Sequence, residues 1–114
     1  MATKTKRFRQ LLQQPGAFIV PGAYDAMTAR LVEEVGFSAV YATGAGISNA
    51  RLGWADVGLT TLTEIVDIVS RIADVTSIPI IADADTGYGN AVNVIRTVRE
   101  FERAGVAAIQ IEDQ

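Results

Sequence analysis

The sequence contains no cysteine and no histidine among its 114 residues. Without cysteine, disulfides, thiolate nucleophiles and zinc–sulfur sites are excluded within this chain. Without histidine, the most common general base and a frequent metal ligand are missing. Any chemistry must therefore rest on carboxylates, hydroxyls, arginines and backbone groups.

The sequence also lacks a long apolar run and an excess of basic residues. No apolar stretch reaches the roughly 18 residues that a membrane span needs, and the N-terminus is too polar for a signal peptide. We therefore expect a cytoplasmic protein with no membrane partner. The formal net charge is −3, from 10 basic and 13 acidic residues. That balance argues against nucleic acid as a partner.

What remains is the composition of a small, core-rich domain. Hydrophobic residues make up 49% of the chain and charged residues 20%, which is typical of a globular protein. The length suits one domain, so we predict a single domain over residues 1–114.

Apolar runs alternate with helical patterns along the chain. We predict a leading helix over residues 4–13 and three later helices over residues 25–36, 60–75 and 90–105. The apolar residues of the segment 60–75 recur at helical spacing. Short, nearly continuous apolar runs predict four strands, within residues 17–25, 37–46, 78–85 and 106–114. Glycines follow the second and third of these strands and indicate loops.

The predicted helices carry recognisable ends. Asp25 is an expected N-cap, and Gly36 and Gly105 stand where helices end. Thr61 and Glu64 have the spacing of a capping box. In the last helix the predicted core-facing side consists of Val94, Ile95, Val98 and Phe101.

Alternating apolar strands and helices predict a parallel sheet covered by helices. Two architectures fit this order: a doubly wound open sheet, or part of a (β/α)8 barrel. Each strand ends in polar residues or glycine, in the segments "PGAYD", "YATGAG", "DADTGYG" and "IEDQ". A barrel collects a site from many strand ends, whereas an open sheet concentrates it at one switch point. Because a barrel needs roughly 250 residues, we predict the N-terminal half of a TIM barrel, with the C-terminal half absent.

Two carboxylates stand at the end of the most apolar strand, in "IPIIADADTGYGN". Residues two apart on a strand share a face, so Asp83 and Asp85 point one way, and Ala82 and Ala84 face the helices. If Glu112 of the next strand joins them, three like charges repel unless a cation lies between them. An all-oxygen site favours Mg²⁺ or Mn²⁺. The alternative is that the aspartates cap the next helix or pair with arginines.

Two glycine-rich segments resemble nucleotide-binding loops, but both match the known motifs weakly. "DTGYGN" lacks the Lys and Ser/Thr of a Walker A loop, and "GAGISN" has Asn49 where a dinucleotide fingerprint has its third glycine. A doubly wound nucleotide-binding domain stays open as an alternative. The glycines are better interpreted as points where ligand oxygens approach backbone N–H groups.

Four motifs occur in order: "PGAYDAMTARL", "YATGAGISNARLGWADVGLTTL", "IADADTGYGN" and "GVAAIQIEDQ". From about Phe8 to Gln114 the chain resembles the isocitrate lyase/phosphoenolpyruvate mutase superfamily, most closely its 2-methylisocitrate lyase-like branch. The resemblance implies a (β/α)8 barrel that binds Mg²⁺, or Mn²⁺, and a small carboxylate substrate. It also implies a homo-oligomer.

The resemblance assigns site residues position by position. The family's direct metal ligand matches Asp83, and its water-mediated metal partners match Asp56, Asp85 and Glu112. Catalytic roles fall on Tyr41 and Asp56. The substrate-binding positions match Tyr41, Thr43, Gly44, Ala45 and Asp83. Many lyases of the family have Ser-Gly-Gly where this chain has Thr-Gly-Ala.

The implied activity is Mg²⁺-dependent cleavage of a carbon–carbon bond in a 2-hydroxy di- or tricarboxylate such as 2-methylisocitrate, through an enolate. Oxaloacetate decarboxylase and phosphoenolpyruvate or carboxyphosphonoenolpyruvate mutase are alternatives within the superfamily. A non-catalytic half-barrel module is a further alternative. The lid with its cysteine acid, and a later arginine and glutamate, follow the position of Gln114 in the family. We therefore expect the 114-residue chain itself to be inactive.

Overall fold

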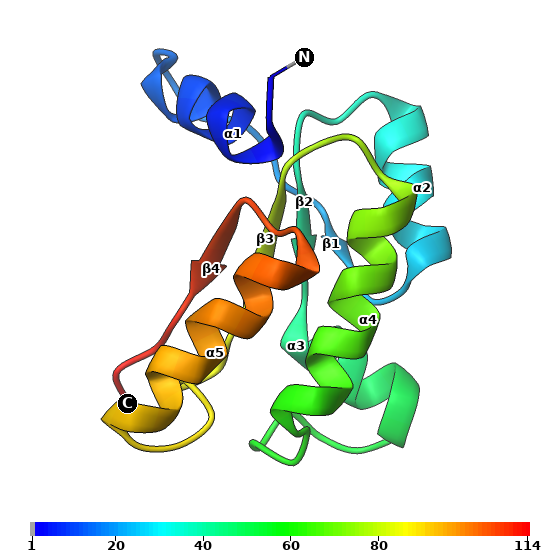
Figure 1. Cartoon of the computed structure of the whole chain (residues 1–114). Helices are drawn as coiled ribbons and strands as arrows, with labels where there is room; N and C mark the ends of the chain where they lie inside the picture. Colours follow the sequence, from blue (N-terminus) through cyan, green and yellow to red (C-terminus); the bar gives the residue numbers. More distant parts are fainter. Residues whose placement is uncertain (1) are drawn as a thin grey trace.

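Helices and short strands alternate along the chain in the computed structural model, which describes residues 2–114 (Figure 1). The elements, in chain order, are α1 (Lys4–Gln13), β1 (Gly22–Ala23), α2 (Ala26–Val35), β2 (Val40–Ala42), α3 (Gly44–Ile47), the π-helix η1 (Ser48–Leu52), α4 (Leu62–Val75), β3 (Ile80–Asp83), α5 (Ala91–Ala104) and β4 (Ala108–Gln110). None of these helices combines the length and apolar character that a bilayer span requires.

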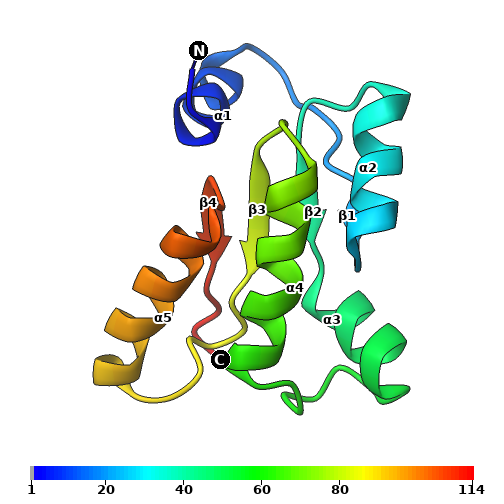
Figure 2. The ribbon, with the colours of Figure 1, turned by 45° about the vertical axis from the view of Figure 1, so that its right-hand side comes forward.

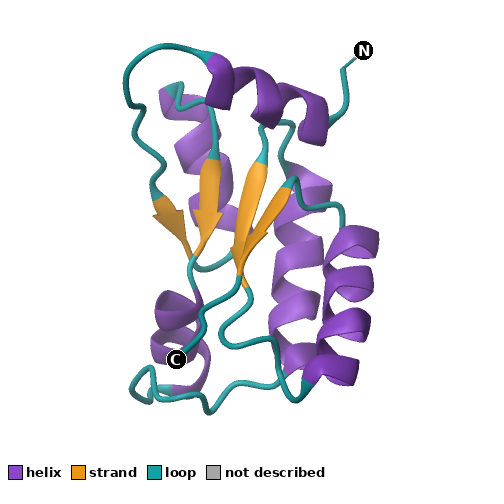
Figure 3. Cartoon of the chain, turned by 90° about the vertical axis from the view of Figure 1, so that its left-hand side faces the viewer, coloured by secondary structure: helices purple, strands orange, loops and turns teal. Residues whose placement is uncertain are grey.

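The four strands form one parallel sheet whose spatial order, β1-β2-β3-β4, follows the chain (Figure 3). Tyr41 pairs with Gly22 on one side and with Ile81 on the other, and Asp83 pairs with Gln110. A doubly wound sheet reverses its strand order at a switch point, and the described strands contain no such reversal. The fold is therefore α/β, with the topology of half a (β/α)8 barrel, as predicted.

The helices α2, α4 and α5 cover one face of this sheet, and α1 lies at the amino ends of the strands (Figure 2). The core forms between them, because alternate strand residues point into the helical layer. Its fully buried members include Val40, Ile65, Val69, Ile72, Ile80, Ala82, Ala84 and Phe101. On the opposite face Tyr41, Ile81 and Asp83 are only half-buried. The sheet is thus covered on one side, and the other side carries the site residues.

Local signals set the helix ends as expected. The Asp25 carboxylate accepts a hydrogen bond from the Thr28 N–H at 2.8 Å, and Gly36 closes α2 in the left-handed region with φ +105°. Thr61 and Glu64 form the predicted capping box of α4. Asn90 caps α5 through a further capping box, with Asn93, that was not predicted.

Three local predictions need correction. The first predicted strand, within residues 17–25, is reduced to Gly22–Ala23. The predicted loop after β2 is instead helical, as α3 and η1. On α5 the side chains of Ile95 and Val98 are 56% and 41% exposed, whereas Thr97 is fully buried. A polar residue can occupy that core position because its hydroxyl donates to the Gly87 carbonyl at 2.7 Å.

Candidate metal and carboxylate site

A cavity of about 360 Å³ opens at the carboxyl ends of the strands. Four carboxylates line it, those of Asp56, Asp83, Asp85 and Glu112, together with the backbone of Gly44. The structure thus brings together all four predicted metal-site residues from three separate segments of the chain. Asp56 comes from the loop before α4, Asp83 and Asp85 from the end of β3, and Glu112 from the segment after β4.

Asp83 has the most closely defined side chain of the four. It is the last residue of β3, where the parallel register places it beside β2 and β4. Its Oδ2 accepts a hydrogen bond from the Gly44 N–H at 3.2 Å, and its Oδ1 accepts one from the Asp85 N–H at 2.9 Å. These two backbone donors fix the orientation of the carboxylate toward the cavity.

The segment after Asp83 has an unusual backbone. Asp85 and Tyr88 have positive φ angles, +48° and +60°, and Gly87 and Gly89 stand at +97° and +140°. The Asp85 carbonyl accepts a hydrogen bond from the Glu112 N–H at 2.8 Å. This contact ties the third strand end to the fourth, so two of the carboxylate-bearing segments are held together through their backbones.

The donor set of the cavity suits a hard divalent cation. All four carboxylates offer oxygen ligands, although the described residues contain no group of three that could hold a metal ion. Mg²⁺ keeps several of its waters and is typically bound through one or two carboxylates. The residues present therefore fit such a cation by their chemistry, and Asp83 as its direct ligand stays a prediction.

Tyr41 lies on the open face of the sheet, near the carboxylates. Its hydroxyl donates to the Gln110 Oε1 at 3.0 Å. Burial, followed by the charges of Asp83, Glu112 and Asp56, raises the pKa of Tyr41 to about 12. The phenol therefore stays protonated at neutral pH, and in this structure its one proton is donated to Gln110.

The remaining predicted substrate residues occupy the start of α3. Thr43 is the N-cap of this helix, and its hydroxyl accepts from the Gly46 N–H at 3.2 Å. Gly44 lines the cavity, whereas Tyr41, Thr43 and Ala45 are outside its lining. Their contact with substrate stays a prediction.

Six residues that line the cavity were not among the predicted site residues: Val57, Gly58, Thr60, Thr86, Tyr88 and Gln114. Burial, and then the charges of Asp83 and Asp85, raise the pKa of Tyr88 well above its ordinary value. The available signal was the pair of glycines flanking Tyr88 in "GYG", which marks a special backbone conformation. Thr60 carried no such signal.

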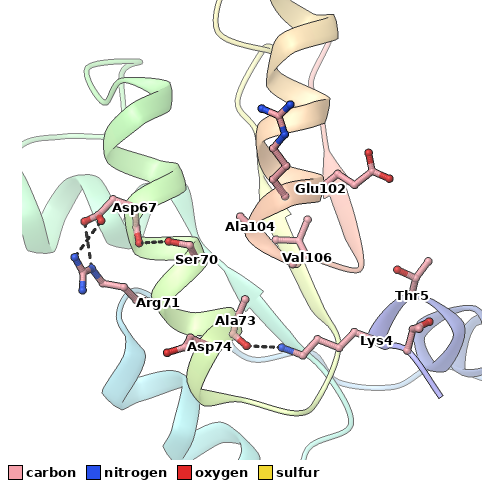
Figure 4. A pocket seen from close by; sticks show the side chains of 13 residues that line it. Lys4, Thr5, Asp67, Ser70, Arg71, Ala73, Asp74, Glu102, Ala104 and Val106 are labelled. Carbon is pink, nitrogen blue, oxygen red and sulfur yellow. Dashed lines mark hydrogen bonds and ion pairs between the residues drawn. The ribbon is translucent and has the colours of Figure 1, made fainter. Parts of the chain in front are cut away.

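A larger hollow of about 840 Å³ lies between α1, α4 and α5 (Figure 4). Two of its basic groups are bound to neighbours that line the same hollow: the Lys4 Nζ donates to the Ala73 carbonyl at 2.6 Å, and Arg71 pairs with Asp67 at 3.2 Å. It lies near the amino ends of the strands, far from the carboxylates. We therefore assign the site to the smaller cavity.

Comparison with known proteins identifies the family of the chain. Residues 8–114 match the phosphoenolpyruvate phosphomutase family. The chain is 56% identical over 108 residues to 2,3-dimethylmalate lyase of Eubacterium barkeri, covering 95% of this chain and 37% of that enzyme. It is 50% identical over 106 residues to 2-methylisocitrate lyase of Aeropyrum pernix, covering 93% of this chain and 34% of that enzyme.

A solved structure of phosphonopyruvate hydrolase in complex with oxalate and Mg²⁺ superposes with a TM-score of 0.93 at 35% identity. That match covers 99% of this chain and 40% of the hydrolase. The chain therefore spans about a third of the length of the curated relatives described above. The family match covers nearly the whole chain, and the fold agrees with that of a solved relative. The chain therefore belongs to the phosphoenolpyruvate mutase/isocitrate lyase superfamily.

Proposed function

We propose that this chain supplies the metal-binding half of a Mg²⁺-dependent carbon–carbon lyase. The proposed substrate is a 2-hydroxy di- or tricarboxylate such as 2-methylisocitrate or 2,3-dimethylmalate. The observation that carries the proposal is the cavity in which Asp56, Asp83, Asp85 and Glu112 meet beside Gly44 at the carboxyl ends of the strands. The lyase names of the two relatives support the reaction class.

In this proposal Asp83 holds the cation directly, and Asp56, Asp85 and Glu112 hold it through water. When bound, Mg²⁺ supplies Lewis-acid stabilisation of negative charge that develops next to the substrate carboxylate. The Gly44 and Asp85 N–H groups keep the Asp83 carboxylate in place, so little reorganisation is needed when the cation binds.

The substrate carboxylate is assigned to the segment from Tyr41 to Ala45. Tyr41 contributes a phenol that is protonated at neutral pH, as an ordinary tyrosine is, and its raised pKa of about 12 keeps it so at higher pH. When substrate binds, this phenol exchanges its acceptor, the Gln110 Oε1, for a substrate oxygen and adds no negative charge to an already acidic site. Thr43 contributes a hydroxyl at the start of α3.

Metal binding is tested on the 114-residue chain by titration with Mn²⁺, followed by calorimetry. Asp83→Ala should lower the affinity at least tenfold, since it removes the direct ligand. Asp74→Ala is the matched control, because Asp74 lies at the far end of α4 beside the other hollow. Wild-type Mn²⁺ affinity in the Asp83 variant would contradict the assignment.

The reaction class is tested with a chimera, because the chain alone is not expected to turn over substrate. Residues 8–114 replace the matching segment of the Eubacterium barkeri 2,3-dimethylmalate lyase. The chimera is assayed with Mg²⁺ against 2,3-dimethylmalate, 2-methylisocitrate and oxaloacetate. Cleavage of either hydroxy acid that is lost with Asp83→Ala supports the lyase. Decarboxylation of oxaloacetate without such cleavage would favour the decarboxylase alternative.

A further inference from the structure

The segment after β2 is one continuous helical run over residues 44–52, made of α3 and the π-helix η1. π-helical turns are rare and occur frequently at functional sites. The first residue of the run, Gly44, donates its N–H to the Asp83 Oδ2 at 3.2 Å. The run ends at Gly53, in the left-handed region with φ +67°, and the loop that carries Asp56 follows. The same short run thus contacts Asp83 at its start and leads into the Asp56 loop at its end.

Ser48 lies in the middle of this run and is buried, with 2% of its surface exposed. A serine within a helix can donate its hydroxyl to the carbonyl four residues earlier. Ser48 instead donates to the Ala55 carbonyl at 3.1 Å, with the Trp54 carbonyl as a second, longer acceptor at 3.4 Å. Because a buried hydroxyl needs such a partner, the Ser48 side chain is fixed against the loop.

The Ala55 carbonyl that Ser48 contacts belongs to a tight turn around Asp56. The same carbonyl accepts the Val57 N–H at 3.0 Å, and a hydrogen bond between residues two apart defines a γ-turn. Asp56 is the central residue of this turn, directly after the Ala55 carbonyl. Residues 53–59 are exposed, and in the described part of the chain Ser48 is the residue whose side chain hydrogen-bonds to this stretch from a neighbouring element.

We propose that Ser48 is a positioning residue: it holds the Ala55 carbonyl, sets the Asp56 carboxylate relative to Asp83, and thereby sets the affinity of the cavity for a divalent cation. This inference rests on the proposed function. The Ser48 and Gly44 contacts come from one helical run, so they fix the Asp56 turn and the Asp83 carboxylate to the same segment. In the proposed site Asp56 holds the cation through water. Loss of the Ser48 hydroxyl therefore lets the turn shift and weakens that contact, while Asp83 stays in place.

The experiment compares the Mn²⁺ affinity of variants of the 114-residue chain, measured from the electron paramagnetic resonance signal of free Mn²⁺. Ser48→Ala should lower the affinity about threefold to tenfold, the effect of one hydrogen bond. Ser48→Thr keeps a hydroxyl and should bind Mn²⁺ as tightly as wild type. Thr76→Val is the matched control, because Thr76 is also buried and its hydroxyl donates to a backbone carbonyl, that of Ile72, at 2.7 Å. Thr76 follows the carboxyl end of α4, whereas the cavity lies at the amino end of that helix, so this variant should keep the wild-type affinity.

A second pair of variants tests whether Ser48 acts through Asp56. Asp56→Asn removes the charge and should lower the Mn²⁺ affinity by about tenfold to a hundredfold, as the loss of an outer-shell metal partner does. Adding Ser48→Ala to Asp56→Asn should cause no further loss, because the carboxylate that Ser48 positions is already gone. A merely structural role for Ser48 would lower the affinity equally in both backgrounds.

The metal-free chain gives an independent measure of the turn. Hydrogen exchange of the Val57 N–H should be faster in Ser48→Ala than in wild type and in Thr76→Val, because the turn loses its anchor. Equal exchange in the three chains would overturn the positioning role.

The outcomes separate the two claims. If wild type does not bind Mn²⁺, the proposed function is overturned, and this inference with it. If wild type binds, the positioning role alone is overturned by wild-type affinity in Ser48→Ala, by an equal loss in Ser48→Thr, or by equal losses in both Asp56 backgrounds. Thermal unfolding checks that each variant is folded. If Ser48→Ala is not, Ser48→Cys carries the test, because its thiol is close in size and a weaker donor.

Discussion

The sharpest test of the site is the substitution Gly44→Ala. Gly44 is the first residue of α3 and donates its N–H to the Asp83 Oδ2 at 3.2 Å. A Cβ atom added at Gly44 would lie 2.6 Å from this Oδ2 and 3.0 Å from the Asp83 Cγ. No real carbon–oxygen contact is that short, so the carboxylate must rotate away from its present position.

The expected loss of Mn²⁺ affinity follows from the hydrogen bond between Gly44 and Asp83, which the rotation breaks. A hydrogen bond to a charged group contributes about 1.5–3 kcal/mol, and 1.4 kcal/mol corresponds to a tenfold change in affinity. If Asp83 is the direct metal ligand, Gly44→Ala should therefore weaken Mn²⁺ binding by about tenfold to a hundredfold. The free energy of unfolding should fall by about 0.5–2.5 kcal/mol, because the preference for alanine over glycine in a helix, about 0.5–1 kcal/mol, offsets only part of the lost hydrogen bond.

The assay pairs a Mn²⁺ titration with urea unfolding of the same variant. Gly36→Ala is the control, because Gly36 has φ +105° and an added Cβ would meet no atom within 4 Å. It should lower the free energy of unfolding by about 1 kcal/mol and leave Mn²⁺ affinity unchanged. Wild-type Mn²⁺ affinity in Gly44→Ala would refute the placement of the cation at Asp83.

Three further predictions concern stability and assembly. Phe101→Ala should lower the free energy of unfolding by about 3–5 kcal/mol, measured in urea, because Phe101 is fully buried; a loss below about 1 kcal/mol would contradict its core role. The pKa of Glu33 is lowered chiefly by a hydrogen bond from the Ser77 side chain. Its contribution to stability is therefore present above the unfolded value, about 4.5, and is lost as pH falls through the lower folded value. Unfolding measured between pH 5 and pH 3, a range around that value, should thus be less pH-dependent in Glu33→Gln, and an unchanged slope would count against the hydrogen bond. Finally, the open sheet face and the edges of β1 and β4 should make the isolated chain self-associate; sedimentation showing a stable monomer would overturn this.

The sequence alone determined the elements whose signals are local. The bounds of α1 agree with the predicted range, and the ends of α2 follow from Asp25 and Gly36, because capping acts within one helical turn. The sequence also predicted that the carboxylates at the ends of the strands lie near one another. Parallel strands place their carboxyl ends at one edge, so Asp83, Asp85 and Glu112 had to come close together.

The tertiary structure decided what depends on contacts between distant residues. Thr97 is buried where Ile95 and Val98 were expected, because only the folded chain brings the Gly87 carbonyl to its hydroxyl. The hydrogen bond from the Glu112 N–H to the Asp85 carbonyl joins two strand ends that no periodic pattern relates. The propensity for a helix or strand depends on residues that are neighbours in the sequence. The geometry of the site depends on tertiary packing, which brings together side chains that are distant in the sequence.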